Sequence, residues 1–487
     1  MTLKQSIGLA VVVFWCLMNL LLIKRQLWAP PPPLFISGTE AIIEATQEWW
    51  GVYYRGEKIG FTSQSIEPNS DGYLLRDDSL LRLNLLGTTQ RALTRLAMHV
   101  DKEWVLKDFN FELQSNDMRF KSRGKIVPGK LHLEIESADY TSTQQIALTQ
   151  PPYLAAALKP LVATQQLEPG KEHFFTIFDP STLAQQMTSI VIEGREQILV
   201  GDKTEPAIKL RQKFKGLSVV SWIDGRGRTL KEESPGGFAL RREAPQQAKS
   251  FAESRAVPLD MIADASIAVG EVIAQPQSRS ALRLRLSGVN MANFALDHGR
   301  QKFSGNELWV EREKVGPSDT YKIPLQDRRF SSFLRPTAFL QSDHPRIRDH
   351  ARQILGEEND AYRAILRLKT SVYNEIKKQP TISIPNALEV LSTKKGDCNE
   401  HTVLFNALAR AAGIPARTVV GMVYLRGAFY YHAWSEVWLG RWISLDSVLD
   451  QFPADVTHIK FVEGEIDRQI DILQLIGNLK IEVLEQQ

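Results

Sequence analysis

Three reactive side chains follow one another in the last third of the chain: Cys398, His432 and Asp446. A thiol, an imidazole and a carboxylate within reach of each other provide a nucleophile, a base for its proton and a group that orients the base. Each residue also has a purely structural interpretation, as a small buried apolar residue, a satisfied core histidine and a turn-capping aspartate. Their order, and the elements predicted around them, favour a nucleophilic site.

The segment that begins at Cys398 is predicted to be a helix with both ends marked. Asp397 suits the N-cap, and Glu400 stands at the third helical position, which completes a capping box. Gly413 and then Pro415 end the helix. Cys398 thus occupies the first helical position, where unpaired N–H groups and the helix dipole favour the nucleophilic thiolate.

Alternating strands follow this helix, with a three-residue turn expected at residues 439–441. His432 and Asp446 are an even number of residues apart, so a hairpin around that turn places both side chains on one face, opposite or diagonal to each other. His432 is then the predicted base toward Cys398, with Asp446 as its orienter. Glu436 shares the face of His432, but four residues along a strand span about 13 Å, too far for contact.

A zinc site that draws on Cys398, His401 and His432 is the chemical alternative. It lacks a second cysteine and a clear fourth ligand, and His401 lies roughly one helical turn behind Cys398. The region before it, residues 49–243, has no clustered cysteines or histidines and no glycine-rich phosphate loop. We therefore expect neither a metal nor a cofactor.

The composition of the chain is that of an ordinary globular protein. Its 487 residues have room for about three folding units. A net charge of +3, from 59 basic and 56 acidic residues, gives no field that would attract nucleic acid, so no nucleic-acid partner is expected. The two cysteines are Cys398 and Cys16, which lies in an N-terminal apolar run, so no intramolecular disulfide is expected and Cys398 is a free thiol.

That apolar run covers residues 6–23 and is flanked by basic residues. At about 1.5 Å per residue it reaches roughly 27 Å, enough for one membrane span with snorkelling flanks. A cleaved signal peptide is the alternative, but no small-residue cleavage site follows the run. The charges on its two sides nearly balance and do not orient it. We expect a transmembrane anchor at residues 1–28 and a proline-rich spacer at 29–45.

The remainder is expected to have an α+β fold. Between residues 46 and 250, short alternating runs separated by turn signals predict a large antiparallel sheet. One helical interlude, Tyr153 to Thr164, interrupts the series. We expect the sheet to curl into a half-barrel around an apolar concavity.

Residues 251–340 are predicted to be a linker followed by a small β segment, with strands that start at Ala281, Asn306 and Asp319. Residues 341–487 are predicted to form the unit that carries the reactive side chains. After Pro345, apolar residues at spacings of three and four predict two helices that lead into it.

At the predicted site the sequence resembles the transglutaminase-like superfamily, a branch of the papain-like cysteine enzymes. The resemblance lies in the segments GDCNEH, ALARAAGIPARTVVGMVY, HAWSEVW and RWISLDSV, and it extends over about residues 345–464. It implies that Cys398 is the acyl-accepting nucleophile, His432 the general base and acid, and Asp446 the orienter. The family commonly has a proline close after the aspartate, whereas Ser447 and Val448 follow here.

The resemblance also implies a setting and a reaction. The N-terminal β region looks like domains attached to bacterial envelope members, so we expect a single-pass protein of the inner membrane whose body is periplasmic and whose substrate is a protein or peptide. A thiol attack on an amide would give a thioester, and hydrolysis is favoured over amide transfer to an amine. A different expectation is that the β region is a non-catalytic module that binds or assembles envelope polymers or proteins.

Overall fold

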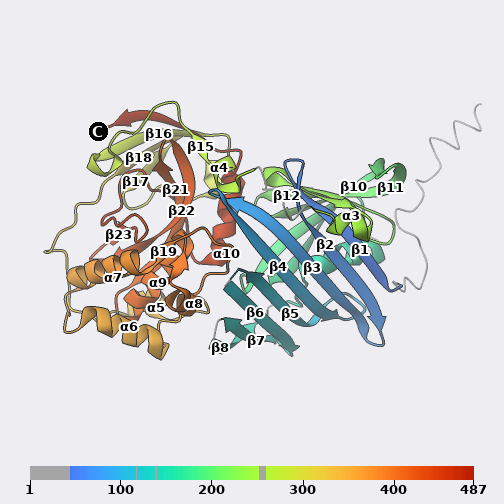
Figure 1. Ribbon diagram of the computed structural model, residues 1–487, viewed down its shortest axis with the longest axis horizontal. Helices are drawn as coiled ribbons and strands as arrows, with labels where there is room; N and C mark the ends of the chain where they lie inside the picture. Colours follow the sequence, from blue (N-terminus) through green and yellow to red (C-terminus); the bar gives the residue numbers. More distant parts are fainter. Residues whose placement is uncertain (1–43, 117, 138–139, 149, 166, 252–258) are drawn as a thin grey trace, which may run out of the picture.

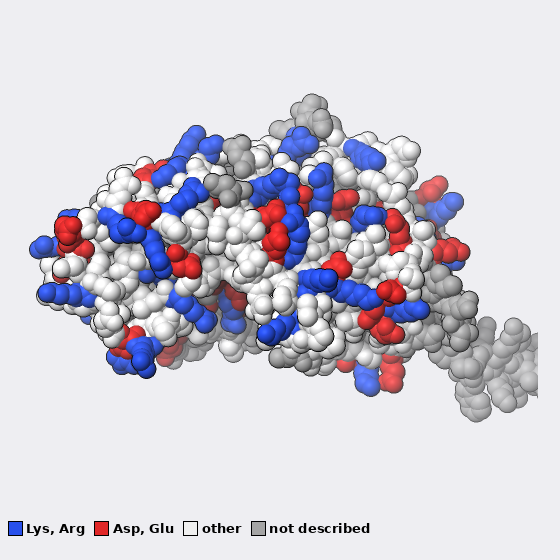
Figure 2. All heavy atoms as spheres, turned by 90° about the horizontal axis from the view of Figure 1, so that it is seen from below, with Lys and Arg blue, Asp and Glu red and all other residues white. Residues whose placement is uncertain are grey.

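The computed structural model describes residues 44–116, 118–137, 140–148, 150–165, 167–251 and 259–487 (Figure 1). The predicted anchor and nearly all of the proline-rich spacer lie outside these residues. Within the described residues, no helix combines the length and the apolar character needed to cross a bilayer. On the face shown in Figure 2, acidic and basic side chains are interspersed, in keeping with the small net charge.

Fourteen strands of the described chain form one antiparallel sheet, as the alternating runs predicted (Figure 1). Neighbours along the chain pair as hairpins, and one long-range pair, β1 with β14, joins the first eight strands to the last six. The strands are β1 (Thr46–Tyr54), β2 (Glu57–Asn69), β3 (Gly72–Leu85), β4 (Thr88–Val100), β5 (Leu106–Ser115), β6 (Met118–Val127), β7 (Lys130–Ser137), β8 (Tyr140–Ala147), β9 (Glu172–Asp179), β10 (Ala184–Val200), β11 (Lys203–Phe214), β12 (Leu217–Ile223), β13 (Thr229–Ser234) and β14 (Phe238–Arg242).

The sheet curls as a half-barrel around an apolar interior that includes the predicted helical interlude. This interlude is a short 3-10 turn, η1 (Ala155–Ala157), followed by helix α2 (Leu158–Gln165). Leu158, Leu161 and Val162 of α2 are completely buried against the inner faces of the strands. Burial of such side chains contributes about 1.5–3 kcal/mol each, which holds the curled sheet onto the helix.

A small four-stranded sheet joins two distant parts of the described chain. Its strands are β16 (Ala281–Ser287), β17 (Gln301–Ser304), β18 (Glu307–Glu311) and the C-terminal β25 (Lys480–Gln486), which pairs with β16. The strand expected from Asp319 is wrong. Pro324 has no N–H to give to a ladder, and the N–H groups of Ile323 and Leu325 bind the carbonyls of Asn359 and Gly413 instead.

The C-terminal part packs helices against a second sheet. The sheet order is β15-β22-β21-β24, with β23 paired to β22. Its strands are β15 (Ile267–Ala268), β21 (Ala416–Leu425), β22 (Ala428–Trp438), β23 (Trp442–Leu445) and β24 (Ile459–Glu463), and the main helices are α6 (Pro345–Leu355), α7 (Ala361–Glu375), α8 (Ala387–Thr393) and α9 (Cys398–Ala411). The two helices predicted after Pro345 are α6 and α7.

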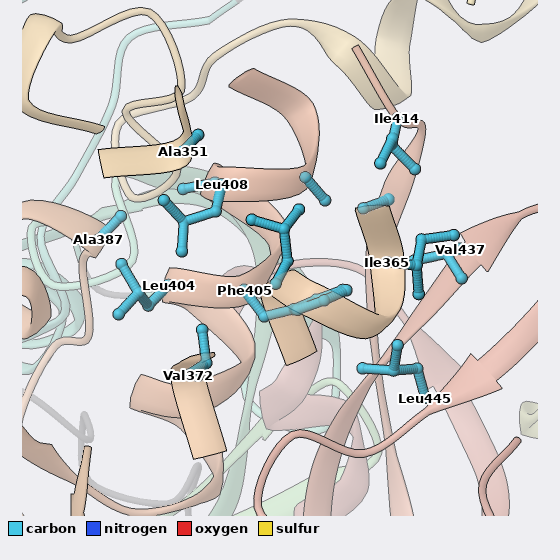
Figure 3. Packing of buried hydrophobic residues seen from close by; sticks show 14 of the residues in the cluster. Ala351, Ile365, Val372, Ala387, Leu404, Phe405, Leu408, Ile414, Val437 and Leu445 are labelled. Carbon is cyan, nitrogen blue, oxygen red and sulfur yellow. The ribbon is translucent and has the colours of Figure 1, made fainter. Parts of the chain in front are cut away.

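Helix α9 lies at the centre of this part. Leu404, Phe405 and Leu408 point from α9 into a core shared with α6, α7 and α8 (Figure 3). All three side chains are buried. Because α9 is enclosed by other helices on one side and by β22 on the other, its first residue is held at a fixed position relative to the strands.

Short elements complete the C-terminal half and connect it to the half-barrel. Glu389 of α8 accepts hydrogen bonds from Ser137 Oγ (2.8 Å) and from the N–H of Arg119 (3.0 Å), both in the large sheet. Lys215, between β11 and β12, forms an ion pair of 3.2 Å with Asp471. The short elements are α3 (Pro245–Lys249), α4 (Met261–Asp264), α5 (Ser331–Leu334), β19 (Lys377–Lys378), β20 (Lys395–Gly396), α10 (Ile466–Gln469) and the 3-10 turns η2 (Pro235–Gly237), η3 (Pro276–Ser278), η4 (Met291–Asn293), η5 (Arg328–Phe330) and η6 (Ile470–Leu475).

Candidate active site

The predicted cysteine stands at the start of α9, as its capping residues indicated. Asp397 caps the helix by accepting the N–H of Asn399 (3.0 Å), and Glu400 Oε2 accepts the N–H of Asp397 (2.8 Å), so both halves of the capping box form. Cys398 is the first helical residue and is half-buried. The predicted helix start is therefore confirmed.

The structure brings the predicted histidine and aspartate together. β22 and β23 pair in register from Ser435 with Leu445 to Trp438 with Trp442, which leaves residues 439–441 as the turn. His432 and Asp446 are diagonal across this hairpin, and His432 Nε2 lies 2.7 Å from Asp446 Oδ2. Both side chains are buried, with 6% and 0% of their surface exposed.

The turn after Asp446 is formed without the proline that the family commonly has there. Asp446 Oδ1 accepts the N–H groups of Val448 (2.6 Å) and Leu449 (2.9 Å), and its backbone pairs with that of Gln451. This is an aspartate turn, in which the side chain takes the place of a backbone acceptor. Oδ1 is thus committed to the turn, and Oδ2 is left for imidazole.

Helix α9, which begins with Cys398, packs on β22, the strand that carries His432. Thr402 Oγ1, one turn along α9, donates to the carbonyl of Ala433 (3.2 Å), and the N–H of Ala433 faces the Cys398 thiol. His432 is the residue before Ala433 and has its Nε2 bound to Asp446. Nδ1 is therefore the nitrogen that remains to take the proton of the thiol.

The protonation state of Cys398 differs from the sequence-based expectation. Burial raises the pKa of the thiol well above its ordinary value, and the neighbouring Asp397 acts in the same direction, while the N–H of Ala433 opposes them. The expected standing thiolate is therefore not the favoured form of the free protein.

The structure adds two residues that sequence reasoning missed, His458 and Asp455. His458 Nε2 lies 2.9 Å from Asp446 Oδ2, and its Nδ1 lies 3.3 Å from Asp455 Oδ1. His458 is completely buried, and its ring centroid is 5.7 Å from that of His432. The available signal in the sequence was an aspartate and a histidine, Asp455 and His458, within twelve residues after Asp446.

A charged network also surrounds Glu436, which sequence reasoning set aside as a third member of the site. Glu436 Oε2 accepts hydrogen bonds from Arg417 Nε (2.7 Å) and Lys460 Nζ (2.8 Å). Although burial acts to raise it, the pKa of Glu436 is lowered by these two cations. Glu436 is thus a carboxylate paired through Oε2 with Arg417 and Lys460.

Two groups of side chains could supply ligands to a metal ion. In the described part of the chain, the cluster of three potential ligands is His432, Asp446 and His458, whose ligand atoms lie within 4.8 Å of one another. Both imidazoles are already bonded to the same carboxylate oxygen at hydrogen-bond distances, and a metal would displace those protons. His401, of the alternative zinc set, has its Nδ1 2.7 Å from the carbonyl of Asp397. The geometry is that of a hydrogen-bonded network.

Comparison with known proteins points to one family. Residues 348–447 match the family described as the transglutaminase-like superfamily, and this range includes Cys398, His432 and Asp446. A search of proteins with curated descriptions found no match. The family match thus covers the helices α6 to α9 and the strands β21 to β23, which build the site.

Three solved structures show partial similarity. A candidate cysteine protease from Cytophaga hutchinsonii is 18% identical, with 42% of this chain and 86% of that chain covered and a TM-score of 0.30. A β-barrel-like protein of a domain of unknown function from Brucella abortus is 12% identical (41% and 94% covered, TM-score 0.31). A member of another family of unknown function from Pseudomonas aeruginosa is 12% identical (36% and 90% covered, TM-score 0.23). At these TM-scores the three structures carry no argument about function.

Proposed function

We propose that the chain is a cysteine enzyme that attacks amide carbonyls through Cys398, His432 and Asp446. The premise of this proposal is the match of residues 348–447 to the transglutaminase-like superfamily. The observation that carries the proposal is the buried His432–Asp446 pair at 2.7 Å, held beside the capped helix start that presents Cys398. A thiol, a base and an orienting carboxylate in this arrangement are the parts of a nucleophilic site.

The reaction begins with the neutral thiol that burial favours. His432 Nδ1 takes the proton from Sγ as Sγ bonds to the amide carbon, and the carbonyl oxygen becomes an oxyanion near the unpaired N–H groups at the start of α9. The C–N bond then breaks, and His432 returns the proton to the leaving amine. The product is a thioester on Cys398. Asp446 remains ionised throughout and holds the imidazole in one orientation.

For the fate of the thioester we propose hydrolysis. Water, activated by His432, attacks the acyl carbon and releases a carboxylic acid and the free thiol, which is the reaction of a peptidase or amidase. Transfer of the acyl group to a primary amine, as in a protein-glutamine transamidase, is the alternative outcome of the same thioester. The two differ in the nucleophile that reaches the acyl carbon, and they are separated by the products formed with and without added amine.

For the location we propose a single-pass inner-membrane protein, anchored by the apolar run at residues 6–23, with its body in the periplasm. The support is the length of that run and its basic flanks. A phosphatase or fluorescent-protein fusion at the C-terminus tests the orientation. A fusion that is active only in the cytoplasm would overturn the periplasmic placement while leaving the proposed chemistry intact.

A second candidate function is a non-catalytic module that binds envelope polymers or proteins through the half-barrel. The observation in its favour is the extent of the fourteen-stranded sheet of the described chain compared with the five-stranded sheet that carries His432. In that case Cys398→Ala would leave partner binding and the cellular phenotype unchanged.

The main experiment compares Cys398→Ala with Cys16→Ala, which removes the other cysteine of the chain. Each full-length variant is incubated with envelope proteins, with and without a biotinylated primary amine, and new termini and new amine adducts are identified by mass spectrometry. We expect new termini with the parent and with Cys16→Ala, and none with Cys398→Ala. Amine adducts in place of new termini would favour transamidation. Equal product patterns for all three proteins would refute the enzyme proposal.

A further inference from the structure

His458 is a buried imidazole that the proposed reaction does not use. It precedes β24 and has none of its surface exposed. Its two ring nitrogens face two different carboxylates, Nε2 toward Asp446 Oδ2 (2.9 Å) and Nδ1 toward Asp455 Oδ1 (3.3 Å). Trp434 packs edge-on against its ring at 5.2 Å between centroids, so the orientation of the ring is fixed.

The partners of the first carboxylate show that it accepts hydrogen bonds at every position. Asp446 Oδ1 accepts from the N–H groups of Val448 and Leu449, while Oδ2 accepts from His432 and faces His458 Nε2. A carboxylate that receives several donors is stabilised in its ionised form. An ionised carboxylate has no proton to give, so Nε2 of His458 must be a donor.

The second carboxylate has the same character. Asp455 Oδ1 accepts from the N–H and the hydroxyl of Thr457 (2.9 and 2.6 Å), and Oδ2 accepts from the side-chain amide of Gln451 (2.9 Å). Nδ1 of His458 therefore also faces an acceptor and must donate. Because both nitrogens donate, the ring is an imidazolium, one positive charge between two negative ones.

We propose, resting on the catalytic role assigned above to Asp446, that His458 is a positioning residue: by donating to Asp446 and Asp455 together, it holds the Asp446 carboxylate in the place from which that carboxylate orients His432. His458 does not touch the thiol or a substrate in this arrangement. It acts on the reaction through Asp446.

The electrostatic surroundings support this role. Although burial acts in the opposite direction, the two carboxylates raise the pKa of His458 to about 9. The charged and titratable groups around the ring are Asp446, Asp455 and His432, together with Arg300, whose guanidinium donates to the backbone carbonyls of Asp455 (2.8 Å) and His458 (2.9 Å). Glu313 pairs with Arg300 at 2.8 Å and balances that charge.

Removal of the imidazolium would change both the position and the charge of the site. Asp446 would keep a single imidazole partner on Oδ2, and the cluster would carry one more uncompensated negative charge next to Cys398. Negative charge disfavours a thiolate, so the apparent pKa of the thiol would rise and His432 would be oriented less well. Both effects slow the reaction of Cys398 with an electrophile at neutral pH.

The test uses iodoacetamide as the probe and the full-length protein, with the alkylated Cys398 peptide quantified by mass spectrometry between pH 6 and 10. For His458→Gln we expect the rate at pH 7 to fall about tenfold. The gap between parent and variant should narrow as the pH rises through about 9, where His458 of the parent loses its proton. The matched control is His350→Gln, which removes an imidazole that pairs with Glu375 at 3.1 Å on the outer helices. The control should keep the parent profile.

A merely structural role for His458 predicts a different result. His458→Gln would then have a lower melting temperature but the same rate profile as the parent, and this outcome would overturn the proposal. The reaction with iodoacetamide needs no substrate. If the parent protein alkylates as described but cleaves no amide, the proposed function is refuted. The proposed effect of His458 on the reactivity of Cys398 would still stand.

A second measurement covers the case in which His458→Gln does not fold. In protein labelled with 15N-histidine, the parent should show both His458 nitrogens protonated at pH 7. Asp455→Asn keeps an oxygen that can face Nδ1 but removes the negative charge of the carboxylate. We therefore expect one nitrogen of His458 to lose its proton well below pH 9. A parent spectrum with one protonated nitrogen at pH 7 would overturn the double donation on which the proposal rests.

Discussion

The charged state of His458 makes the stability of the protein depend on pH in a window where few other groups titrate. The pKa of His458 is raised to about 9 in the folded protein, against an ordinary value of 6.5. The folded state therefore binds this proton more tightly than the unfolded state. The stabilisation is complete below pH 6.5 and is lost as the pH rises through about 9.

The size of the effect follows from the difference between the two pKa values. At about 1.4 kcal/mol per pKa unit, the proton on His458 contributes roughly 3 kcal/mol at pH 6.5. Roughly 2 kcal/mol of this should disappear between pH 7 and pH 8.5. The pKa of Asp77 is raised to about 6 by burial, so that group titrates below this window, and Cys398 and Tyr431, with raised pKa values, titrate above it.

The assay is unfolding by denaturant in detergent solution, followed by tryptophan fluorescence at pH 7.0, 7.5, 8.0 and 8.5. His458→Gln is measured in parallel, because subtraction of its free energy of unfolding removes the contribution of every titrating group that is not coupled to His458. The difference between parent and variant should shrink by roughly 2 kcal/mol as the pH rises over this range. A difference that stays constant would mean that His458 is not protonated in the folded protein, and it would refute the reasoning from the two carboxylates.

Three further predictions concern single side chains. Asp446→Asn should slow amide cleavage by about 10²- to 10⁴-fold at saturating substrate, because an amide cannot carry the charge that both imidazoles face; a loss below about threefold in kcat would contradict the role of Asp446. Arg300→Lys should lower the free energy of unfolding by about 2–4 kcal/mol, since an ammonium cannot span the carbonyls of residues 454, 455 and 458 as the guanidinium does, whereas Arg329→Lys, at an exposed ion pair, should leave the free energy of unfolding essentially unchanged. Phe405→Ala, at a completely buried position, should cost about 3–5 kcal/mol in the same unfolding assay, while Phe174→Ala, at a position 63% exposed, should stay within about 0.5 kcal/mol.

Local interactions explain how much of the site could be predicted from the sequence. The helix start at Cys398 depends on a capping box within four residues, and the placement of His432 beside Asp446 depends on a three-residue turn and the two-residue period of a strand. The antiparallel half-barrel is built almost entirely from hairpins between successive strands. Turn residues and the alternation of apolar and polar residues along each strand therefore predicted it. Such features are encoded by neighbours in the chain and can be read without the fold.

The parts that sequence reasoning missed depend on residues far apart in the chain. Arg300 lies in the small β segment, more than 150 residues before the loop whose carbonyls, at residues 454, 455 and 458, it binds. Neither segment has a sequence pattern that predicts this contact. The strand expected from Asp319 does not form because its backbone groups bind two loops, one between α6 and α7 and one between α9 and β21. The last strand, β25, found its partner about 200 residues earlier, in β16.

By itself, the sequence determined the candidate site residues, the helix and hairpin that carry them, and the antiparallel character of the N-terminal region, because these follow from spacing over a few residues. Only the tertiary structure decided the protonation of the site. Burial against β22 raises the pKa of Cys398, and the enclosure of His458 between Asp446 and Asp455 gives that ring its charge. Both effects arise from the loss of water around a group and from charges brought close by folding, and neither depends on the order of residues along the chain.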